Sequence, residues 1–309
     1  MPELPEVERA KDLIRDEVVG RTIVEVNNVD DHKVIQGVDE PKELEKHLVG
    51  WKVTGVKRKG KYLVLELEEG GGNSPSSSDS DSASKQWITA HFGMTGSFLV
   101  KGLKPGIVYK SFDVDESSWP PRFWKVCVVF SDGTELSFVD ARRFGRFKIS
   151  RCDPMLSKPL CDLGPDALLE PPSCTELHNL LLQRKGAIKA VLLDQSFLSG
   201  IGNWVGDEIL FQSSIHPEQP ANTLTADQSR ALHSAMEHVL VTATSANADS
   251  SKFPSSWLFH SRWTGKKATK VEGGKQVKFI TVGGRTSAFV PSVQKKTGRA
   301  DSKKRKSRS

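Results

Sequence analysis

The chain has 309 residues, of which 37% are hydrophobic and 27% charged, and its formal net charge is +6. This length suffices for two domains with hydrophobic cores, and the absence of any run of eighteen apolar residues excludes a membrane-spanning helix. The sequence shows neither a secretory leader nor a C-x-x-C pair, so we expect an intracellular protein with free thiols at Cys127, Cys152, Cys161 and Cys174.

The positive charge is concentrated near the C-terminal end. Residues 295–309 hold eight Lys or Arg and one acid, a charge of +7, which leaves the rest of the chain near −1. A nucleic-acid site in the body therefore has to use local basic clusters. The run Lys303-Lys304-Arg305-Lys306 predicts a nuclear import signal or a DNA-tethering arm, with a solvated tail as the alternative.

The first half of the chain has mainly the alternating pattern of strands. After Met1-Pro2-Glu3, residues 7–19 place apolar side chains on one helical face, and Gly20 is a natural stop. Strand patterns follow at 22–29, 51–67, 86–100, 126–130 and 134–139, with a short helix candidate at 43–48. Asp132-Gly133 is a hairpin signal, and residues 70–85, mostly Gly, Ser and Asp, predict a disordered loop.

The second half changes to a helical period. Residues 176–183, 188–193, 204–211 and 227–244 favour helices, and strand patterns return at 277–282 and 286–290 around Gly283-Gly284-Arg285. We place a boundary near residue 152, where the period changes across a Pro-containing segment. The sequence therefore predicts an α+β protein with four regions, at 1–152, 153–250, 251–293 and 294–309.

The residue after Met1 is small, so removal of the methionine would expose the secondary amine of Pro2. An α-amino group has a pKa of about 8, which leaves a useful unprotonated fraction at neutral pH. Such an amine attacks a sugar C1′ to give an iminium directly, and Glu3 would lie beside it as an acid or base. On residue type alone, a proline and a glutamate here are ordinary features of a helix start.

Several motifs, in order along the chain, resemble the formamidopyrimidine-DNA glycosylase and endonuclease VIII family. Residues 2–8, Pro-Glu-Leu-Pro-Glu-Val-Glu, are similar to the N-terminus of the family, and residues 57–63 resemble its strand with a catalytic lysine. Residues 91–96, His-Phe-Gly-Met-Thr-Gly, resemble its glycine-rich DNA loop, and residues 140–145, Asp-Ala-Arg-Arg-Phe-Gly, its duplex-probing loop. Residues 163–166, 192–211 and 284–286 extend the resemblance to most of residues 2–291.

The resemblance implies a catalytic β-sandwich domain at 1–152 that begins with a helix. It also implies a helix-two-turn-helix DNA-binding domain at 153–250, and a lesion loop with a finger hairpin at 251–293. The implied activity is that of a bifunctional DNA glycosylase and abasic-site lyase of base excision repair. It would remove formamidopyrimidines, with 8-oxoguanine a less secure substrate, and cleave the strand by β,δ-elimination. We expect damaged double-stranded DNA as partner, no membrane association, a monomer and a nuclear location.

The implied catalytic residues are Pro2, Glu3, Lys61 and Arg285. The implied DNA contacts are Met94, Lys125, Arg142, Arg143, Phe144, Lys185, Lys189 and Asn203. Apolar and planar groups fill the hole that a flipped nucleotide leaves, which suits Met94, Arg142 and Phe144; a core role is the alternative for Met94 and Phe144. For Lys61, Lys185 and Lys189 the alternative is a solvated charge, and for Asn203 a plain N-cap. Glu208 matches a position implied to order the nucleophile.

Many members of the family close with four cysteines around zinc, but this chain has no cysteine after Cys174. We therefore expect no zinc and no cofactor, as in the zincless eukaryotic branch of plant or fungal type, with the hairpin held by packing. Residues 247–270 are the expected lesion loop, with Trp257, Phe259 and Trp263 available for stacking. Two other functions stay open: a non-catalytic DNA-binding protein of the same fold, and an isolated use of the helix-two-turn-helix module.

Overall fold

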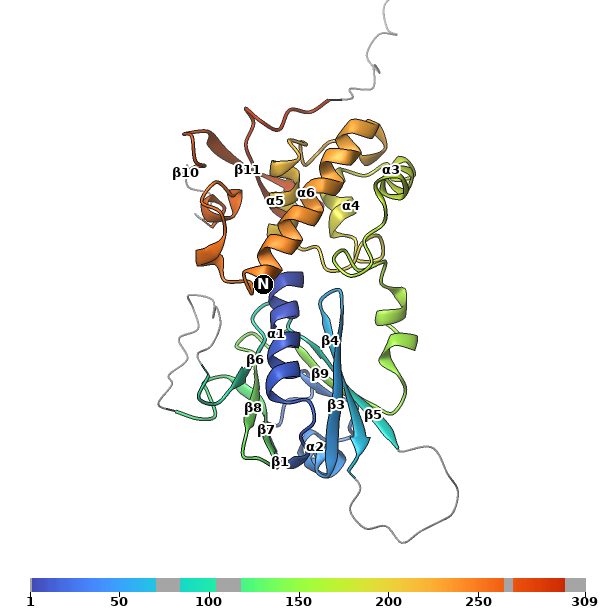
Figure 1. The fold of residues 1–309 in the computed structure, drawn as a ribbon, viewed down its shortest axis with the longest axis vertical. Coiled ribbons are helices and arrows are strands. Elements are labelled where there is room, and N and C mark those ends of the chain that lie inside the picture. Colours follow the sequence, from blue (N-terminus) through green and yellow to red (C-terminus); the bar gives the residue numbers. More distant parts are fainter. Residues whose placement is uncertain (1, 71–83, 104–117, 264–268, 298–309) are drawn as a thin grey trace, which may run out of the picture. The chain divides into compact units, whose positions relative to one another are not determined.

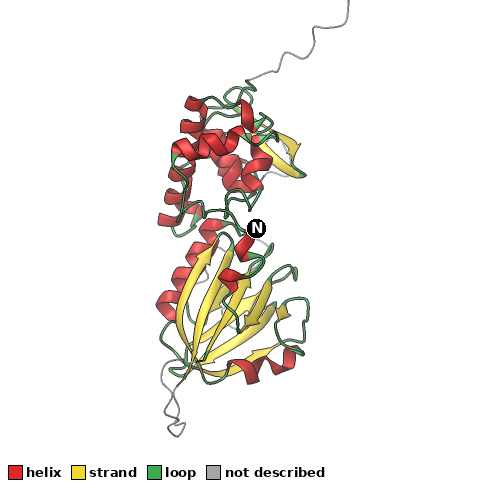
Figure 2. Cartoon of the chain, turned by 90° about the vertical axis from the view of Figure 1, so that its right-hand side faces the viewer, coloured by secondary structure: helices red, strands yellow, loops and turns green. Residues whose placement is uncertain are grey.

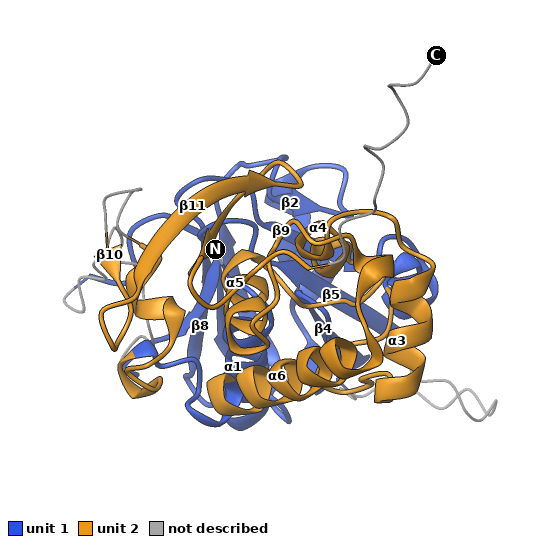
Figure 3. Ribbon diagram, turned by 90° about the horizontal axis from the view of Figure 1, so that it is seen from above, with its two compact units in different colours: residues 1–163, 244–250 blue, residues 164–243, 251–309 orange. Residues whose placement is uncertain are grey.

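The computed structural model describes residues 2–70, 84–103, 118–263 and 269–297 (Figure 1). The chain divides into two compact units, residues 1–163 with 244–250 and residues 164–243 with 251–309 (Figure 3). Most of the loop expected at 70–85 and the basic tail from residue 298 lie outside the described residues. Within the described ranges, every helix is too short or too polar to cross a membrane.

The first unit consists of two sheets and a long N-terminal helix (Figure 2). The five-stranded sheet has the order β2 (Ile35–Gln36), β9 (Arg146–Ser150), β5 (Lys85–His91), β4 (Tyr62–Glu69) and β3 (Trp51–Lys59). The four-stranded sheet has the order β1 (Ile23–Asn28), β7 (Trp124–Phe130), β8 (Glu135–Val139) and β6 (Ser97–Val100). Phe98 and Phe138 of one sheet and Leu65 and Phe147 of the other belong to one buried cluster. The expected β-sandwich core is therefore present.

Helix α1 (Leu4–Glu17) starts three residues before the predicted helix, because Glu3 caps it and Pro5 is tolerated in its first turn. It buries Val7, Ala10 and Ile14 in the core of the first unit. The short helix α2 (Leu44–Leu48) follows the 3-10 turn η1 (Pro41–Glu43). The N-terminal residues are thus attached to a helix that is fixed by apolar packing.

The strands β2 and β9 were missed by the sequence reasoning. Strand β9 alternates in burial, with Phe147 and Ile149 inside, and it pairs antiparallel with β5 and parallel with β2. Its alternating pattern is present in the sequence but directly follows the loop motif at 140–145. The run predicted at 86–100 divides into β5 and β6 around Gly93, as expected.

The described part of the second unit contains the helices α3 (Cys174–Leu182), α4 (Ile188–Leu193), α5 (Asn203–Gln212) and most of α6 (Ala226–Ser245). It ends with β10 (Thr269–Lys270) and the hairpin of β11 (Gln276–Val282) and β12 (Arg285–Phe289). These elements lie close to the predicted positions, and the α+β class is confirmed.

The first unit continues to Leu163 and not only to residue 152. The segment between these positions forms two 3-10 turns, η2 (Pro154–Leu156) and η3 (Leu160–Asp162), which lack both the strand and the helix period. The boundary predicted at residue 152 marks where the strands end, whereas the packing that defines the first unit continues through the two 3-10 turns to Leu163.

Candidate active site and DNA-contacting surface

The N-terminus of α1 holds two carboxyl groups beside a buried proline. Pro2 is buried, and Glu3 is only 2% exposed. The backbone N–H of Glu3 donates to Oε2 of Glu6 at 2.9 Å. Burial, and then the neighbouring charge of Glu3, raises the pKa of Glu6 to about 7. One of two adjacent carboxyl groups can therefore keep a proton near neutral pH, which is the arrangement that general acid–base chemistry needs.

A buried ion pair ties this helix to the turn that carries Lys61. The Arg58 side chain, which is fully buried, donates from Nε to Oε2 of Glu8 and from Nη1 to the carbonyl oxygen of Gly60 at 2.9 Å. Gly60 has φ +57°, a conformation that side chains other than glycine disfavour. Lys61 follows directly, half-buried in the turn just before β4. The motif at 57–63 thus contains Arg58 in a structural contact, whereas the catalytic role of Lys61 stays a prediction.

Lys61 interacts electrostatically with His91, which in turn interacts with Arg146, and sequence reasoning named only Lys61 of these three as a site residue. Burial, together with the charges of Lys61 and Arg146, lowers the pKa of His91 to about 4. Nδ1 of His91 accepts from the backbone N–H of Gly93 at 3.2 Å, so the neutral ring carries its proton on Nε2. The pairing of the strands is what could have identified His91 and Arg146, because Tyr62, next to Lys61, pairs with His91, and His91 pairs with Arg146.

The loops at 92–96 and 140–145 are locked together by Asp140, which is completely buried. Its Oδ1 accepts from Thr95 Oγ1 at 2.6 Å and from the Arg142 backbone N–H at 3.1 Å, and its Oδ2 accepts from Gly145 N–H at 2.6 Å. At Gly93, a Cβ would lie 2.3 Å from the carbonyl carbon of Phe144, so the backbones are in direct contact. The two motifs form one rigid surface.

This surface presents Phe144, Arg142 and Met94. Phe144 is 45% exposed, which contradicts the core alternative for this residue, while Met94 is half-buried. The Arg142 guanidinium is exposed and lies 5.1 Å from the Phe144 ring centroid. A rigid loop that holds an apolar ring in water beside an arginine fits insertion into a gap in a base stack.

Arg143 and Lys125, by contrast, are paired within the protein. Arg143 donates from Nε and Nη2 to both oxygens of Asp31, at 2.8 and 3.0 Å, and Lys125 Nζ lies 3.4 Å from the same carboxylate. Burial alone would raise the pKa of Asp31, but the hydrogen bonds and charges of Arg143 and Lys125 lower it. Contact of Arg143 and Lys125 with DNA stays a prediction, whereas the structure shows that both pair with Asp31.

In the second unit, Asn203 is the first residue of α5 and not its N-cap, which is Gly202. Its Nδ2 donates to the carbonyl oxygen of Thr286 at 3.0 Å, which joins the helix start to β12. Arg285 is the exposed first residue of β12, after the Gly283-Gly284 turn, and Lys185 is exposed before α4. In the described part of the chain, neither Lys185 nor Arg285 has an ion-pair partner. Both remain available for phosphate.

Lys189 does not fit the predicted DNA contact. It is 0% exposed, and its Nζ lies 2.6 Å from Oδ1 of Asp207 and donates to the carbonyl oxygen of Asn203 at 2.6 Å. Lys185 and Lys189 are four residues apart, but only Lys185 points to solvent. The prediction fails because the buried partner of Lys189 lies far along the sequence and leaves no local signal.

Glu208 is fully buried and faces a turn of its own unit, η6 (Leu258–Ser261). It accepts from Phe259 N–H and from Gln212 Nε2, both at 2.9 Å, and burial raises its pKa to about 7. It also lines a pocket of about 480 Å³ together with His238 and Trp257. These contacts give Glu208 a structural role in the second unit, and its ordering of the nucleophile stays a prediction.

Of the three aromatic residues expected to stack on a lesion, Trp257 is buried, Phe259 is half-buried and Trp263 is exposed. Trp257 is 3% exposed, and Phe259 packs edge-on against Trp204 at 5.0 Å and against Phe253 at 5.1 Å between ring centroids. Trp263 is 54% exposed and lies under the Arg262 guanidinium. Residues 264–268 of the expected lesion loop lie outside the described residues. Only Trp263 of the three is presented to solvent.

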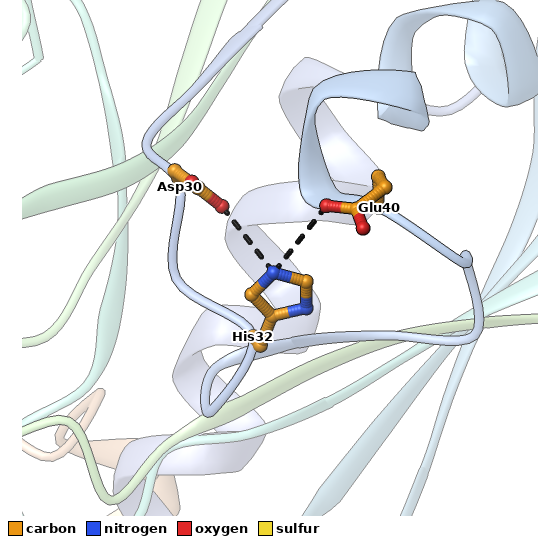
Figure 4. Close-up of side chains that lie close together, drawn as sticks. All are labelled: Asp30, His32 and Glu40. Atoms are coloured by element: carbon orange, nitrogen blue, oxygen red, sulfur yellow. Dashed lines mark ion pairs between the residues drawn. The ribbon is translucent and has the colours of Figure 1, made fainter.

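A group of side chains of metal-ligand type lies on the segment after β1. Nε2 of His32 is 3.6 Å from Asp30 Oδ1 and 3.5 Å from Glu40 Oε2 (Figure 4). All three side chains are exposed. Exposed ion pairs of this kind are common on protein surfaces and contribute little to stability, so we interpret the group as a surface ion cluster.

Models of three domains match the chain. The formamidopyrimidine-DNA glycosylase N-terminal domain matches residues 1–147, the H2TH domain of the same enzymes residues 163–255, and the formamidopyrimidine-DNA glycosylase-like C-terminal domain residues 257–291. The matches are consecutive and follow the order of motifs in the sequence.

Curated relatives and solved structures agree with these matches. The formamidopyrimidine-DNA glycosylase of Arabidopsis thaliana is 40% identical over 97% of this chain and 72% of its own length. That of Desulfitobacterium hafniense is 36% identical over 81% of each chain. A complex of Lactococcus lactis Fpg with abasic-site DNA has a TM-score of 0.73 at 25% identity, covering 96% of this chain and all of that one. A complex of an inhibited LlFpg with DNA containing N7-benzyl-Fapy-dG has a TM-score of 0.72 at 25% identity, with the same coverage.

Proposed function

Because the chain belongs to the formamidopyrimidine-DNA glycosylase family, we propose that it is a bifunctional DNA glycosylase and abasic-site lyase of base excision repair. It acts on damaged double-stranded DNA and removes oxidised or ring-opened purines, with formamidopyrimidines as the principal substrates. The observation that carries the proposal is the first unit's arrangement of Pro2 and Glu3 at the start of α1, tied through Glu8 and Arg58 to the turn of Lys61.

In the proposed reaction, the Pro2 nitrogen, exposed by removal of Met1, forms a bond to C1′ of the damaged nucleotide. The glycosidic C1′–N bond breaks, the base leaves with its electron pair, and the proton that the Pro2 nitrogen loses is passed to the base. Glu3 donates a proton to O4′, which opens the sugar ring and leaves an iminium between C1′ and Pro2.

Strand cleavage follows from the acidity that the iminium gives to C2′. Loss of a C2′ proton expels the 3′ phosphate as the C3′–O bond breaks, and a second elimination expels the 5′ phosphate from C5′. Lys61, in the turn before β4, and Arg285, at the start of β12, bind these phosphates as cations, and Lys61 also supplies a proton. No dissolved cofactor enters this sequence of steps.

DNA opening is assigned to the surface that carries Met94, Arg142 and Phe144. The exposed Phe144 ring fills the space of the flipped nucleotide, and the Arg142 guanidinium bonds the base left opposite. Arg143 keeps this loop in place through Asp31. Asn203 and the N-terminus of α5, with Lys185 nearby in sequence, bind phosphates from the second unit.

A zinc ion at the hairpin does not fit the residues present. The described residues from Thr269 to Thr297 include neither cysteine nor histidine. Nε2 of His260 lies 3.2 Å from the carbonyl oxygen of Pro254, where it acts as a donor and not as a metal ligand. Zinc prefers thiolate and imidazole ligands, so we propose a metal-free finger.

We also propose a nuclear location. The basic run from Lys303 to Lys306 supports it, since compact clusters of this composition are typical of import signals. The test is the distribution of a fluorescent fusion with and without residues 298–309, fused so that Pro2 stays at the N-terminus. Nuclear accumulation without the tail would contradict the import role of the basic run, and absence of the full-length fusion from nuclei would contradict the nuclear location.

The reaction is tested by borohydride trapping on a duplex with one abasic site, using untagged protein whose loss of Met1 has been verified by mass. We expect a covalent protein–DNA band with the wild-type chain and none with Pro2→Gly. Absence of the band from protein with a free Pro2 would contradict the proposed chemistry and favour a non-catalytic DNA-binding role. Glu3→Gln is expected to abolish release of a formamidopyrimidine base.

A further inference from the structure

The Asp207 carboxylate joins three segments of the second unit that are distant in sequence. Its Oδ1 lies 2.6 Å from Nζ of Lys189 on α4. Its Oδ2 accepts from Arg262 at 2.7 Å through Nη2 and at 3.2 Å through Nε, and from the backbone N–H of Ala288 on β12 at 3.1 Å. The side chains of Lys189, Asp207 and Arg262 are 0%, 1% and 6% exposed. We call these three side chains the ionic node.

The ionic node continues to the backbone of the predicted phosphate contact. Lys189 Nζ also donates to the carbonyl oxygen of Asn203 at 2.6 Å, at the first residue of α5. Helix α5 passes close to this ammonium, since a Cβ at Gly206 would lie 3.1 Å from Nζ. The position of the α5 N-terminus is therefore coupled to the charge of Asp207.

The same node fixes the hairpin that carries Arg285. Ala288, three residues after Arg285 on β12, is held by Asp207, and Thr286 is held by the side chain of Asn203 at 3.0 Å. At the turn, a Cβ on Gly283 would lie 3.0 Å from Cβ of Ala190 on α4, so the hairpin tip packs closely on that helix. These contacts involve no metal ligand.

The contacts of the ionic node are directional, because each of the two buried cations donates to a particular oxygen of the Asp207 carboxylate. A buried charge without a partner costs several kcal/mol, so neither Lys189 nor Arg262 can leave Asp207 without replacement by another acceptor. A purely apolar contact would permit the hairpin to slide, whereas the two oxygens of Asp207 accept from donors in fixed directions.

We propose that Asp207, through Lys189, Arg262 and Ala288, is a positioning residue that sets Asn203 and Arg285 for phosphate binding without a metal. This inference rests on the proposed function for the role of Asn203 and Arg285. Asp207 and its two cations do not touch DNA themselves; they determine where the phosphate-binding groups stand.

The test uses full-length Arg262→Met, which keeps an unbranched apolar stem and removes the guanidinium with its hydrogen bonds. We expect amide hydrogens of residues 285–289 to exchange at least tenfold faster than in the wild type, with α3 amides unchanged. Binding to abasic-site DNA should weaken at least tenfold, and the slope of log affinity against log salt should fall by about 0.9 for each phosphate that the variant no longer binds.

Arg262→Lys keeps the charge and one donor to Asp207, so it should recover most of the hairpin protection and of the salt slope. It also keeps the test valid if Arg262→Met folds poorly. The matched control is Arg230→Met, which removes an exposed ion pair with Asp227 in the same unit and should change neither measurement.

Wild-type exchange at 285–289 and a wild-type salt slope in Arg262→Met would overturn the inference. Uniformly faster exchange in α3 and the hairpin, with an unchanged salt slope, would also overturn it, because the node would then only stabilise the unit. Failure of the proposed function is distinguishable, since it is seen as absence of borohydride trapping by the wild-type chain, whereas hairpin exchange and DNA binding need no catalysis.

Discussion

The two units hold their predicted functional groups with buried ions, but in different ways. In the first unit, Glu8 pairs with the buried Arg58 and with the less buried Lys11 of its own helix, and Arg58 links the helix that follows Pro2 to the turn that carries Lys61. In the second unit, Asp207 is shared between two cations and a backbone N–H on three segments. A large two-sheet core surrounds the first pair, whereas the hairpin of the second unit has a small cluster of its own around Leu258, Val277 and Val290. Where apolar packing is scarce, ionic contacts define more of the geometry.

Removal of the charge of Asp207 should produce the largest effect. Asp207→Asn leaves the buried Lys189 and Arg262 without a counter-charge, so we expect the free energy of unfolding to fall by about 3–5 kcal/mol. Urea denaturation measures it, with the 88%-exposed Asp227→Asn as control. A loss below about 1 kcal/mol would show that the node is not needed to stabilise the second unit.

Protonation of Glu208 should give the next largest effect. Its pKa is about 7 in the folded protein against 4.5 ordinarily, so the folded state binds more protons between these values. Stability therefore falls as pH rises from about 4.5 to about 7, by up to about 3 kcal/mol. Glu208→Gln should remove this part of the fall, as measured by urea denaturation at pH values on both sides of this window.

Glu6 of the first unit provides a comparison for that measurement, because burial and the charge of Glu3 also raise its pKa to about 7. Glu6→Gln should likewise flatten the pH dependence of stability, and it should in addition change the pH profile of base release, since its carboxyl holds Glu3. If Glu208→Gln changed that profile as much as Glu6→Gln, the two carboxyls would not have the separate roles assigned here.

Loss of the ion pair of the first unit should be milder. Glu8→Gln keeps a hydrogen-bond acceptor for Arg58, whose Nη1 still donates to Gly60, so we expect a loss of about 2 kcal/mol. Burial opposes ionisation of Glu8, but Arg58 and Lys11 lower its pKa overall. The ionised Glu8 therefore stabilises the folded protein fully above the ordinary pKa of a glutamate, and this stabilisation is lost as pH falls. The deficit of the variant should therefore shrink in acid.

Denaturation of Glu8→Gln at neutral and acid pH, beside Asp16→Asn on the exposed side of α1, measures this effect. A slower rate of borohydride trapping is expected as well, because the link between α1 and the Lys61 turn loses its ionic part and is held less firmly. Wild-type trapping together with lower stability would leave the pair a stabilising role only.

The smallest effect separates the two arginines of the probing loop. Arg143→Ala loses two hydrogen bonds to Asp31 and should lower the midpoint of urea denaturation, whereas Arg142→Ala should leave that midpoint nearly unchanged. Binding to lesion DNA should show the opposite order, with about tenfold loss for Arg142→Ala. Equal effects of both variants in both assays would contradict the division into holding and contacting residues.

Local sequence patterns predicted most elements, but they could not distinguish the cations that contact solvent from those that hold the fold. Lys185 and Lys189 are both lysines at helical spacing, yet only Lys189 is buried, because it pairs with Asp207. This partner lies eighteen positions further along the chain, and Arg262, which pairs with the same carboxylate, lies further still. Arg143 follows Arg142 directly, but its partner Asp31 precedes it by more than a hundred residues. Long-range pairing of this kind is set by tertiary packing.

The aromatic residues show the same limit. Trp257, Phe259 and Trp263 stand close together in the sequence, and only Trp263 is exposed. In contrast, the glycine-rich motifs at 91–96 and 140–145 were informative, because a glycine required by a close backbone approach is needed whatever packs elsewhere. The family resemblance supplied the catalytic roles, which composition and periodicity do not contain.

The backbone contact between Gly93 and Phe144 limits how the recognition surface can diversify. Since the two loops touch at a point where not even a methyl group fits, neither can be lengthened, shortened or reshaped alone. New preferences for the opposing base are therefore expected to arise by side-chain exchange at Met94, Arg142 or Phe144 on an unchanged main chain. In a library of variants, insertions in either loop should be rare among the survivors, while substitutions at these three positions should be frequent.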